Sequence, residues 1–150
     1  MPTEPLGVKG STVWQNDTTH VVGASGRSGA ALCRALLAAG GDVVPVVRDA
    51  TRWAATGIAR PPRVVDLRDV VTLARMLADA RAVVSCAHAR HAPAILRAAG
   101  TEARIVLLGS TRRFTRWPDA HGVGVIAGEA ALLASGRRGV MLHPTMIYGA

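Results

Sequence analysis

The fold of this chain is decided by a glycine-rich stretch near its amino end, Val21-Val22-Gly23-Ala24-Ser25-Gly26-Arg27-Ser28-Gly29-Ala30. A short apolar run over positions 19–23 reads as a strand. Apolar residues then recur at helical spacing over positions 28–39, until Gly40 and Gly41 end the pattern. The stretch therefore predicts a strand, a glycine turn and a helix in direct succession.

The spacing of the three glycines, G-x-x-G-x-x-G, has a physical meaning at each position. Gly23 permits a tight turn, Gly26 lets the backbone approach a pyrophosphate, and Gly29 lets the helix pack closely on the strand. The helix that follows offers free N–H groups and a positive dipole end to phosphates. We therefore predict a dinucleotide-binding turn, with an ordinary turn that binds nothing as the alternative.

The remaining sequence alternates between apolar runs and helical patterns. Strands are expected at 42–47, 63–67, 81–85, 104–108 and 139–143, and helices at 49–57, 69–80, 92–99 and 123–135. This alternation predicts an α/β fold, a doubly wound parallel Rossmann sheet of six strands in the order 3-2-1-4-5-6 between two helical layers. Pro45 lies inside the second strand, where we expect a bulge because proline cannot donate to a ladder.

Length and composition exclude several classes of protein. The 150 residues, 49% of them apolar, suit one domain with one core. The sequence contains no apolar run long enough for a membrane span and no secretory signal, and its two cysteines are too few for a disulfide framework. We therefore expect a cytoplasmic protein without membrane contact. The net charge of +8 comes from scattered arginines, so no nucleic-acid partner is expected.

The residue at the end of the second strand usually selects the dinucleotide. Arg48 stands there and is suited to a 2′-phosphate, and Arg27 in the glycine turn offers a second guanidinium. These residues favour NADP. Asp49 follows directly and keeps NAD open, since a carboxylate there binds a ribose 2′-hydroxyl.

Four segments resemble the extended and atypical short-chain dehydrogenase/reductase superfamily, which contains NAD-dependent epimerases and dehydratases. They are the glycine turn, Asp66-Leu67 after the third strand, Ser110 after the fifth, and His143-Pro144-Thr145-Met146-Ile147-Tyr148-Gly149. The resemblance implies that Asp66 contacts adenine and that Ser110 binds a substrate carbonyl or hydroxyl. It also implies that Pro144 and Thr145 lie beside the carboxamide.

The catalytic pair of that superfamily, a Tyr with a Lys four residues later, has no counterpart in this chain. Alignment through Glu129 places His121 at the Tyr position and Val125 at the Lys position, and the only tyrosine is Tyr148. We therefore expect an atypical active site in which His121 stands in as proton donor, because an imidazole titrates near neutral pH.

The candidate site residues follow from these arguments. Cofactor binding is assigned to Gly23, Ser25, Gly26, Arg27, Ser28, Gly29, Arg48, Asp66, Leu67, Ala87, Pro144 and Thr145. Catalysis is assigned to Ser110 and His121. No metal site is expected, because Cys86, His88 and His91 supply only three ligands in an unfamiliar pattern.

Residues 1–18 are expected to form a loose arm, and residues 19–150 one dinucleotide-binding domain that lacks a C-terminal substrate portion. A naturally short polypeptide is the alternative. Two functions stay open. One is an NAD(P)-dependent epimerase, dehydratase or reductase acting on a small substrate, for which Arg112, Arg113 and Arg116 would suit an anionic group. The other is a catalytically inert NADP(H)-binding redox sensor.

Overall fold

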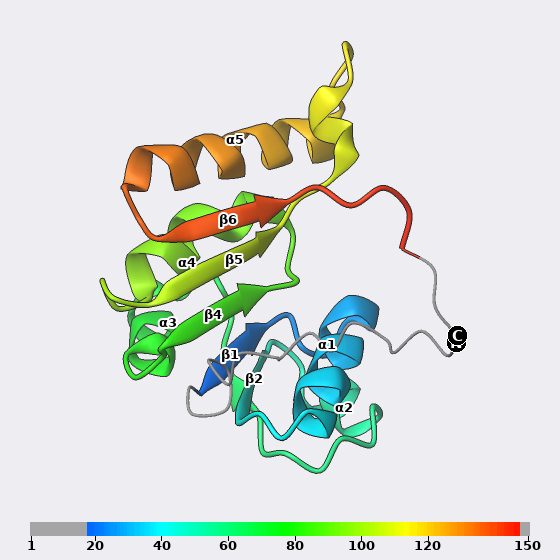
Figure 1. Cartoon of the computed structure of the whole chain (residues 1–150), viewed down its shortest axis with the longest axis vertical. Helices are drawn as coiled ribbons and strands as arrows, with labels where there is room; N and C mark the ends of the chain where they lie inside the picture. Colours follow the sequence, from blue (N-terminus) through cyan, green and yellow to red (C-terminus); the bar gives the residue numbers. More distant parts are fainter. Residues whose placement is uncertain (1–17, 148–150) are drawn as a thin grey trace, which may run out of the picture.

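The computed structural model describes residues 18–147, which form one parallel six-stranded sheet flanked by helices (Figure 1). The strands are β1 (Thr19–Val22), β2 (Val43–Val47), β3 (Arg63–Val64), β4 (Ala82–Ser85), β5 (Arg104–Leu108) and β6 (Gly139–Leu142). Their order is β3-β2-β1-β4-β5-β6, which confirms the predicted doubly wound Rossmann topology. The winding direction reverses between β1 and β4. The predicted arm, apart from Thr18, and the Tyr148-Gly149 end of the last motif lie outside the described residues.

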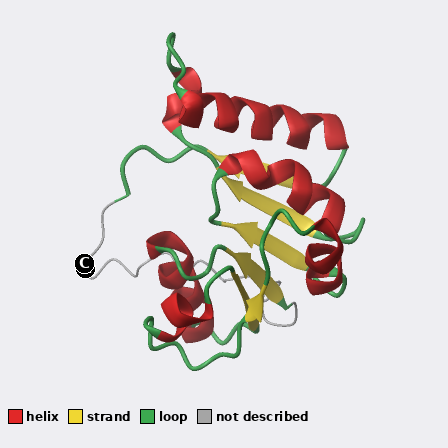
Figure 2. Cartoon of the chain, turned by 180° about the vertical axis from the view of Figure 1, so that it is seen from behind, coloured by secondary structure: helices red, strands yellow, loops and turns green. Residues whose placement is uncertain are grey.

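Helices cover the sheet on both sides. They are α1 (Arg27–Ala38), α2 (Ala50–Ala54), α3 (Val70–Leu77), α4 (Ala92–Ala98) and α5 (Ala120–Ser135), with short 3-10 turns η2 (Ala89–His91) and η3 (Thr111–Phe114). The first two helices lie on one face and the last three on the other (Figures 1 and 2). Two cores result, one joining Val21 and Val47 to Cys33 and Trp53, and a larger one beneath α3, α4 and α5.

The contact between α1 and β1 depends on Gly29. A Cβ at this position would lie 2.8 Å from the Cα of Ala24 and would also overlap the carbonyl oxygen of Gly23. Gly23 itself has φ +75°, a left-handed conformation that glycine adopts without strain. The glycine spacing therefore performs the turning and packing roles that the sequence predicts.

Aspartate side chains cap the start of three helices, namely α2, α3 and α5. The carboxylate of Asp119 accepts the N–H of Gly122 at 2.8 Å, so α5 starts at Ala120 instead of near Val123. Asp49 caps α2 in the same way. The early start of α5 escaped the sequence analysis because its first turns contain Gly122 and Gly124, which are poor helix formers.

The expected bulge at Pro45 is wrong. The β1–β2 register runs without interruption through the pair Val21–Pro45. The carbonyl of Val46 accepts from Gly23 on the β1 side, so Pro45, one residue earlier, directs its backbone nitrogen toward β3. The β2–β3 pairing begins only at Val46, and no ladder donor is missing. The third strand is also shorter than the expected 63–67.

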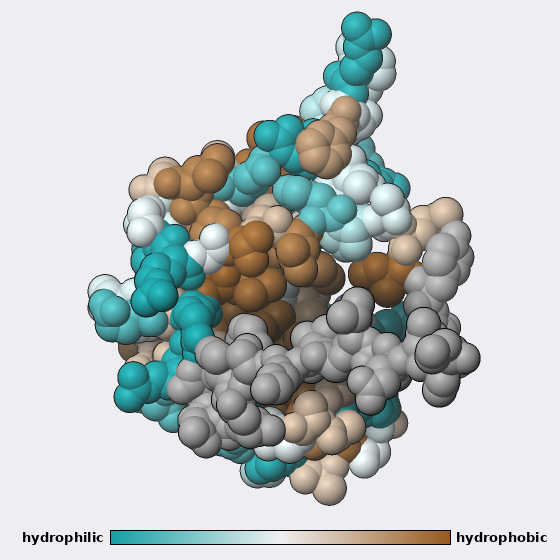
Figure 3. All heavy atoms as spheres, in the orientation of Figure 1, coloured by the Kyte–Doolittle hydropathy of each residue, from teal (hydrophilic) through white to brown (hydrophobic). Residues whose placement is uncertain are grey.

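One half of the sheet carries no helix of the described chain on the α1 side. Val140 of β6 pairs with Val106, and the register continues through Val84 to Val21, so all four point to this side. Val140 and Leu142 are 46% and 50% exposed. Figure 3 shows the apolar surface that results over β4, β5 and β6.

None of the helices that the structure describes combines the length and the apolarity needed to span a bilayer.

The packing of Gly29 predicts a difference between two glycine substitutions. Gly29→Ala should lower the free energy of unfolding by about 1–3 kcal/mol, because the new Cβ has no space against β1. Gly26→Ala is the matched control, since its Cβ would meet only the carbonyl oxygen of Gly23 at 3.4 Å. Urea unfolding of both variants measures the difference. Equal stability of the two would contradict the account.

Candidate functional site

A cavity of about 670 Å³ lies at the carboxyl end of the central strands, beside the reversal between β1 and β4. Its walls come from the glycine turn, the end of β2 and the segments after β3 and β4. The lining residues are Gly23, Ser25, Gly26, Val46, Val47, Arg48, Asp49, Arg52, Val65, Asp66, Leu67, Arg68, Cys86, Ala87, His88, Arg90 and His91. This is the place where doubly wound sheets bind their ligands, and the volume suits a small molecule.

The cavity brings together many of the predicted cofactor residues and leaves others outside. Those inside are Gly23, Ser25, Gly26, Arg48, Asp66, Leu67 and Ala87. Arg27, Ser28 and Gly29 form the first turn of α1 beside it but do not line it, and Pro144 and Thr145 follow β6. Arg52 and Arg68 also line the cavity, and no pattern in the sequence singled them out. His88 and His91, considered from the sequence only as metal ligands, line it together with Arg90.

The glycine turn presents the start of α1 to the cavity. The N–H of Gly26 donates to the carbonyl of Gly23 at 3.1 Å and closes the turn. Gly26 is also the N-cap of α1, and no side chain caps this helix. The first N–H groups of α1 are therefore without a side-chain acceptor, which is the arrangement that binds phosphate groups.

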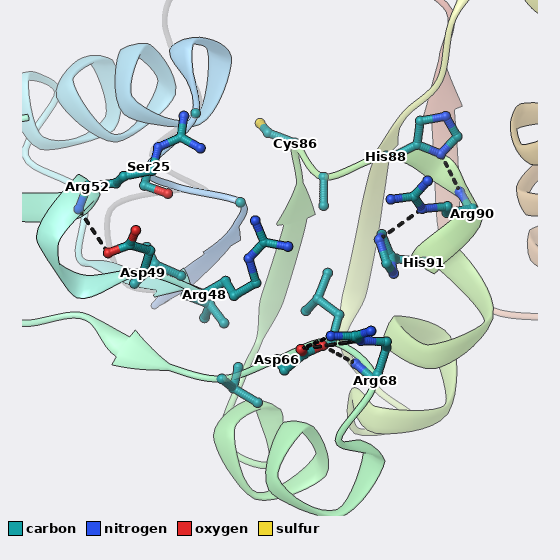
Figure 4. A pocket seen from close by; sticks show the side chains of 17 residues that line it. Ser25, Arg48, Asp49, Arg52, Asp66, Arg68, Cys86, His88, Arg90 and His91 are labelled. Atoms are coloured by element: carbon teal, nitrogen blue, oxygen red, sulfur yellow. Dashed lines mark hydrogen bonds and ion pairs between the residues drawn. The ribbon is translucent and has the colours of Figure 1, made fainter. Parts of the chain in front are cut away.

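Arg48 and Asp49 take different roles at the end of β2. Oδ1 of Asp49 accepts the N–H groups of Thr51 at 2.8 Å and of Arg52 at 3.2 Å, so this carboxylate holds the start of α2. The guanidinium of Arg48 points into the cavity (Figure 4) and hydrogen-bonds to no other described residue. Of these two residues, only Arg48 has a side chain whose hydrogen-bonding groups are all still available to a ligand.

Asp66 is held by Arg68. Oδ2 accepts from Nη2 of Arg68 at 2.7 Å, and Oδ1 accepts from its Nε at 3.1 Å and its N–H at 2.9 Å. These bonds, with the charge of Arg68, keep the pKa of Asp66 well below its usual range. Both carboxylates of the cavity are therefore engaged by the protein itself.

The segment after β4 is fixed by its contact with α5. A Cβ at Gly124 would lie 2.7 Å from Cε1 of His88 and 3.3 Å from Cβ of Arg90, so only glycine leaves room for η2 here. The N–H of Arg90 donates to Nδ1 of His88 at 3.0 Å. The ring of His88 thus lines the cavity and also lies against the first turns of α5.

His88 connects the cavity to His121. Nε2 of His88 lies 3.1 Å from Nδ1 of His121, and the rings stand edge to face with centroids 4.4 Å apart. Because Nδ1 of His88 accepts from Arg90, neutral His88 carries its proton on Nε2 and donates it to His121. Neutral His121 then has its own proton on Nε2. The pKa of His88 is lowered, first by burial and then by the neighbouring charges of His121 and Arg90.

Ser110 belongs to a second network. Its Oγ accepts the N–H of Arg112 at 3.2 Å, and its own N–H donates to Nδ1 of His143 at 3.2 Å. Nε2 of His143 lies 3.2 Å from Oε1 of Glu129, whose other oxygen accepts from Nε of Arg113 at 2.5 Å. Neither Ser110 nor His121 lines the cavity, and no hydrogen bond joins them.

Two other sequence candidates have clear positions. Val125, at the expected Lys position, is 1% exposed and packs in the core. Burial raises the pKa of the Cys86 thiol, which disfavours the reactive thiolate. Within residues 18–147, no three His, Cys, Asp or Glu side chains gather as a metal-binding group.

Comparison with known proteins agrees with this geometry. The sequence profile of a family described as NAD(P)H-binding matches residues 23–133, which include the glycine turn and the whole cavity. The chain belongs to this NAD(P)H-binding family. A search of curated protein sequences finds no match.

Solved structures share the fold at low sequence identity. A short-chain dehydrogenase/reductase superfamily protein from Agrobacterium tumefaciens with bound NAD has a TM-score of 0.70 at 18% identity, over 84% of this chain and 48% of that one. An NADPH-dependent quinone oxidoreductase from Escherichia coli has a TM-score of 0.68 at 21% identity, over 84% of this chain and 46% of that one. The enzyme WbmH of Bordetella bronchiseptica, in complex with NAD+, has a TM-score of 0.71 at 18% identity, over 85% of this chain and 55% of that one.

The first of these neighbours is a protein of the superfamily that the sequence resembles, the short-chain dehydrogenase/reductases. The NAD(P)H-binding chain described here spans about half the length of each of the three.

The Glu129 network predicts a pH-dependent contribution to stability. Burial raises the pKa of Glu129, but hydrogen bonds from His143 and Arg113 outweigh it and leave the pKa below 4.5. The contribution is therefore present above pH 4.5 and is lost as the pH falls below that value. Glu129→Gln should lower the free energy of unfolding by only about 1 kcal/mol at neutral pH, because Arg113 is partly exposed and solvent weakens its interaction with Glu129.

Urea unfolding across this pH range measures the effect. Glu102→Gln is the control, because Glu102 is exposed and makes no ion pair with a described residue. An equal loss of stability in Glu129→Gln at neutral and at acidic pH would contradict the charge-based explanation.

The histidine pair predicts defined tautomers. In long-range ¹H–¹⁵N NMR spectra at neutral pH, neutral His88 and His121 should both carry the proton on Nε2. His88→Ala removes the donor to His121, so the ring of His121 should become a mixture of tautomers. His91→Ala is the control and should leave the tautomer of His121 unchanged. Finding the His121 proton on Nδ1 in the unmodified protein would refute the assignment.

Proposed function

We propose that the chain binds NADP(H), with the pyrophosphate at the glycine turn and the 2′-phosphate at Arg48. The observation that carries this proposal is the contrast between the two adjacent side chains at the end of β2. Arg48 extends into the cavity without a hydrogen-bonding partner among the described residues, whereas Asp49 holds the start of α2. A free guanidinium suits a phosphate, and a committed carboxylate suits a ribose hydroxyl less well.

Fluorescence titration with NADPH and NADH tests the choice of cofactor. We expect NADPH to bind more tightly, and Arg48→Ala to weaken NADPH about tenfold, as loss of one partly exposed charge-assisted contact does. NADH affinity should change less than about twofold. Arg81→Ala is the matched control, because this exposed arginine lies at the start of β4, away from the cavity.

Two results would overturn the proposal. One is tighter binding of NADH than of NADPH by the unmodified protein. The other is an equal effect of Arg48→Ala on both cofactors.

The proposed reaction is of the reductase or epimerase/dehydratase type on a small substrate, with Ser110 and His121 binding its oxygen atoms. Ser110 follows β5, and His121 lies one hydrogen bond from the cavity through His88. Neutral His121 would donate a hydrogen bond from Nε2. Giving up that proton would leave an imidazolate, so the geometry supports stabilisation of a carbonyl oxygen better than the transfer of a proton.

The apolar face over β4, β5 and β6 supports the proposal that a C-terminal substrate portion belongs to this domain. Parallel sheets are normally covered on both faces, and this face leaves Val140 and Leu142 half exposed. A portion seated here would adjoin the segments after β5 and β6, which contain Ser110 and Pro144. We propose that such a portion supplies further side chains to the substrate, beside Ser110 and His121.

An inert NADP(H) sensor is the second candidate function. It is favoured by Val125, because a buried apolar side chain occupies the position where the resembled enzymes carry their lysine. Hydride transfer from NADPH to a panel of carbonyl compounds and quinones separates the candidates. Turnover that falls in both Ser110→Ala and His121→Ala supports the enzyme, and cofactor binding without any turnover supports the sensor. A cytoplasmic location and the absence of a nucleic-acid partner stay predictions.

A further inference from the structure

The cavity carries two arginines that face each other from opposite walls. Arg48 extends from the end of β2 and Arg90 from η2 after β4, and their guanidinium groups point into the same space (Figure 4). The cavity has two carboxylates that could neutralise them. Asp49 caps α2 and Asp66 is bound by Arg68, and no ion pair joins either carboxylate to Arg48 or Arg90. Positive charge therefore remains on both walls.

The orientation of Arg90 is set by its neighbours. Its N–H is bound to His88, and its Nε donates to Nε2 of His91 at 3.3 Å. The turn that carries it lies against α5 at Gly124. With Nε anchored, the two terminal nitrogens of the guanidinium have no partner among the described residues. They are left to bind a ligand.

An anion bound between the two walls would offset the repulsion between Arg48 and Arg90. Two facing guanidinium groups repel each other, and a phosphate accepts hydrogen bonds from both. Arg48 alone would hold a phosphate from one side only. A ligand that fills the cavity from the glycine turn to the segment after β3 passes between the two walls that carry these arginines.

We propose that Arg90 binds a phosphate group of the dinucleotide from the β4 wall, opposite Arg48. The proposal rests on the proposed NADP(H) binding and adds a second binding residue to it. Two phosphate sources have the required chemistry, namely the 2′-phosphate and the pyrophosphate. His91 acts as a positioning residue, because it accepts from Nε of Arg90 and does not need to touch the ligand.

The test compares Arg90→Ala with Arg97→Ala. Arg97 lies in the last turn of α4, is exposed and does not line the cavity, so its removal gives the same change in net charge. We expect Arg90→Ala to weaken NADPH binding about tenfold relative to Arg97→Ala, with an unchanged thermal unfolding midpoint. Titration with NADH then identifies the source. A loss for NADPH alone indicates the 2′-phosphate, and an equal loss for both cofactors indicates the pyrophosphate.

Affinities of Arg90→Ala within about twofold of Arg97→Ala for both cofactors would overturn the proposal while leaving NADP(H) binding intact. Failure of the unmodified protein to bind either cofactor would instead reject the proposed function itself.

The positioning role of His91 has its own readout. His91→Gln keeps an acceptor for Nε of Arg90 and should retain NADPH affinity, whereas His91→Ala should lose part of it. Equal affinities of the two variants would show that His91 does not orient Arg90.

Discussion

The close packing of α1 on β1 is the contact on which the rest of the molecule depends. Gly29 has no side chain, so the first turn of α1 lies directly against Gly23 and Ala24. This contact points the uncapped start of the helix at the carboxyl edge of the sheet, where the reversal between β1 and β4 opens a cavity. One glycine and the turn before it thus place the start of α1 beside the cavity, in an arrangement that suits a phosphate group.

The electrostatics of the cavity follow from how its few carboxylates are used. Asp49 stabilises the start of α2 and Asp66 holds Arg68, so neither balances the arginines that face the open space. The walls therefore favour an anionic ligand, although the excess of arginine over the whole chain says little by itself. On the other side of the cavity, the ring of His88 packs against α5 and also hydrogen-bonds to His121. The ring of His88 thus joins the cavity to the proposed catalytic region.

The sequence was sufficient for the topology and for the glycine turn, because both depend on local patterns that a strand and a helix must show. It also placed Arg48 and Asp66 in the cavity, since the ends of parallel strands meet at one edge. It could not place His88 against His121, because that contact joins residues far apart in the chain and needs the space left by Gly124. The bulge at Pro45 was wrong for a related reason, namely that the extent of the neighbouring strand decides whether a donor is missing.

The central claim is that a dinucleotide lies between the glycine turn and the walls that end β2 and β4. Mapping backbone amide shifts in ¹H–¹⁵N spectra during titration with NADP+ tests it most directly. We predict that the largest shifts fall on residues 23–29, 46–49, 66–68 and 86–91, which surround the cavity. Shifts confined to the apolar face over β4, β5 and β6, or no saturable shifts at all, would contradict the account.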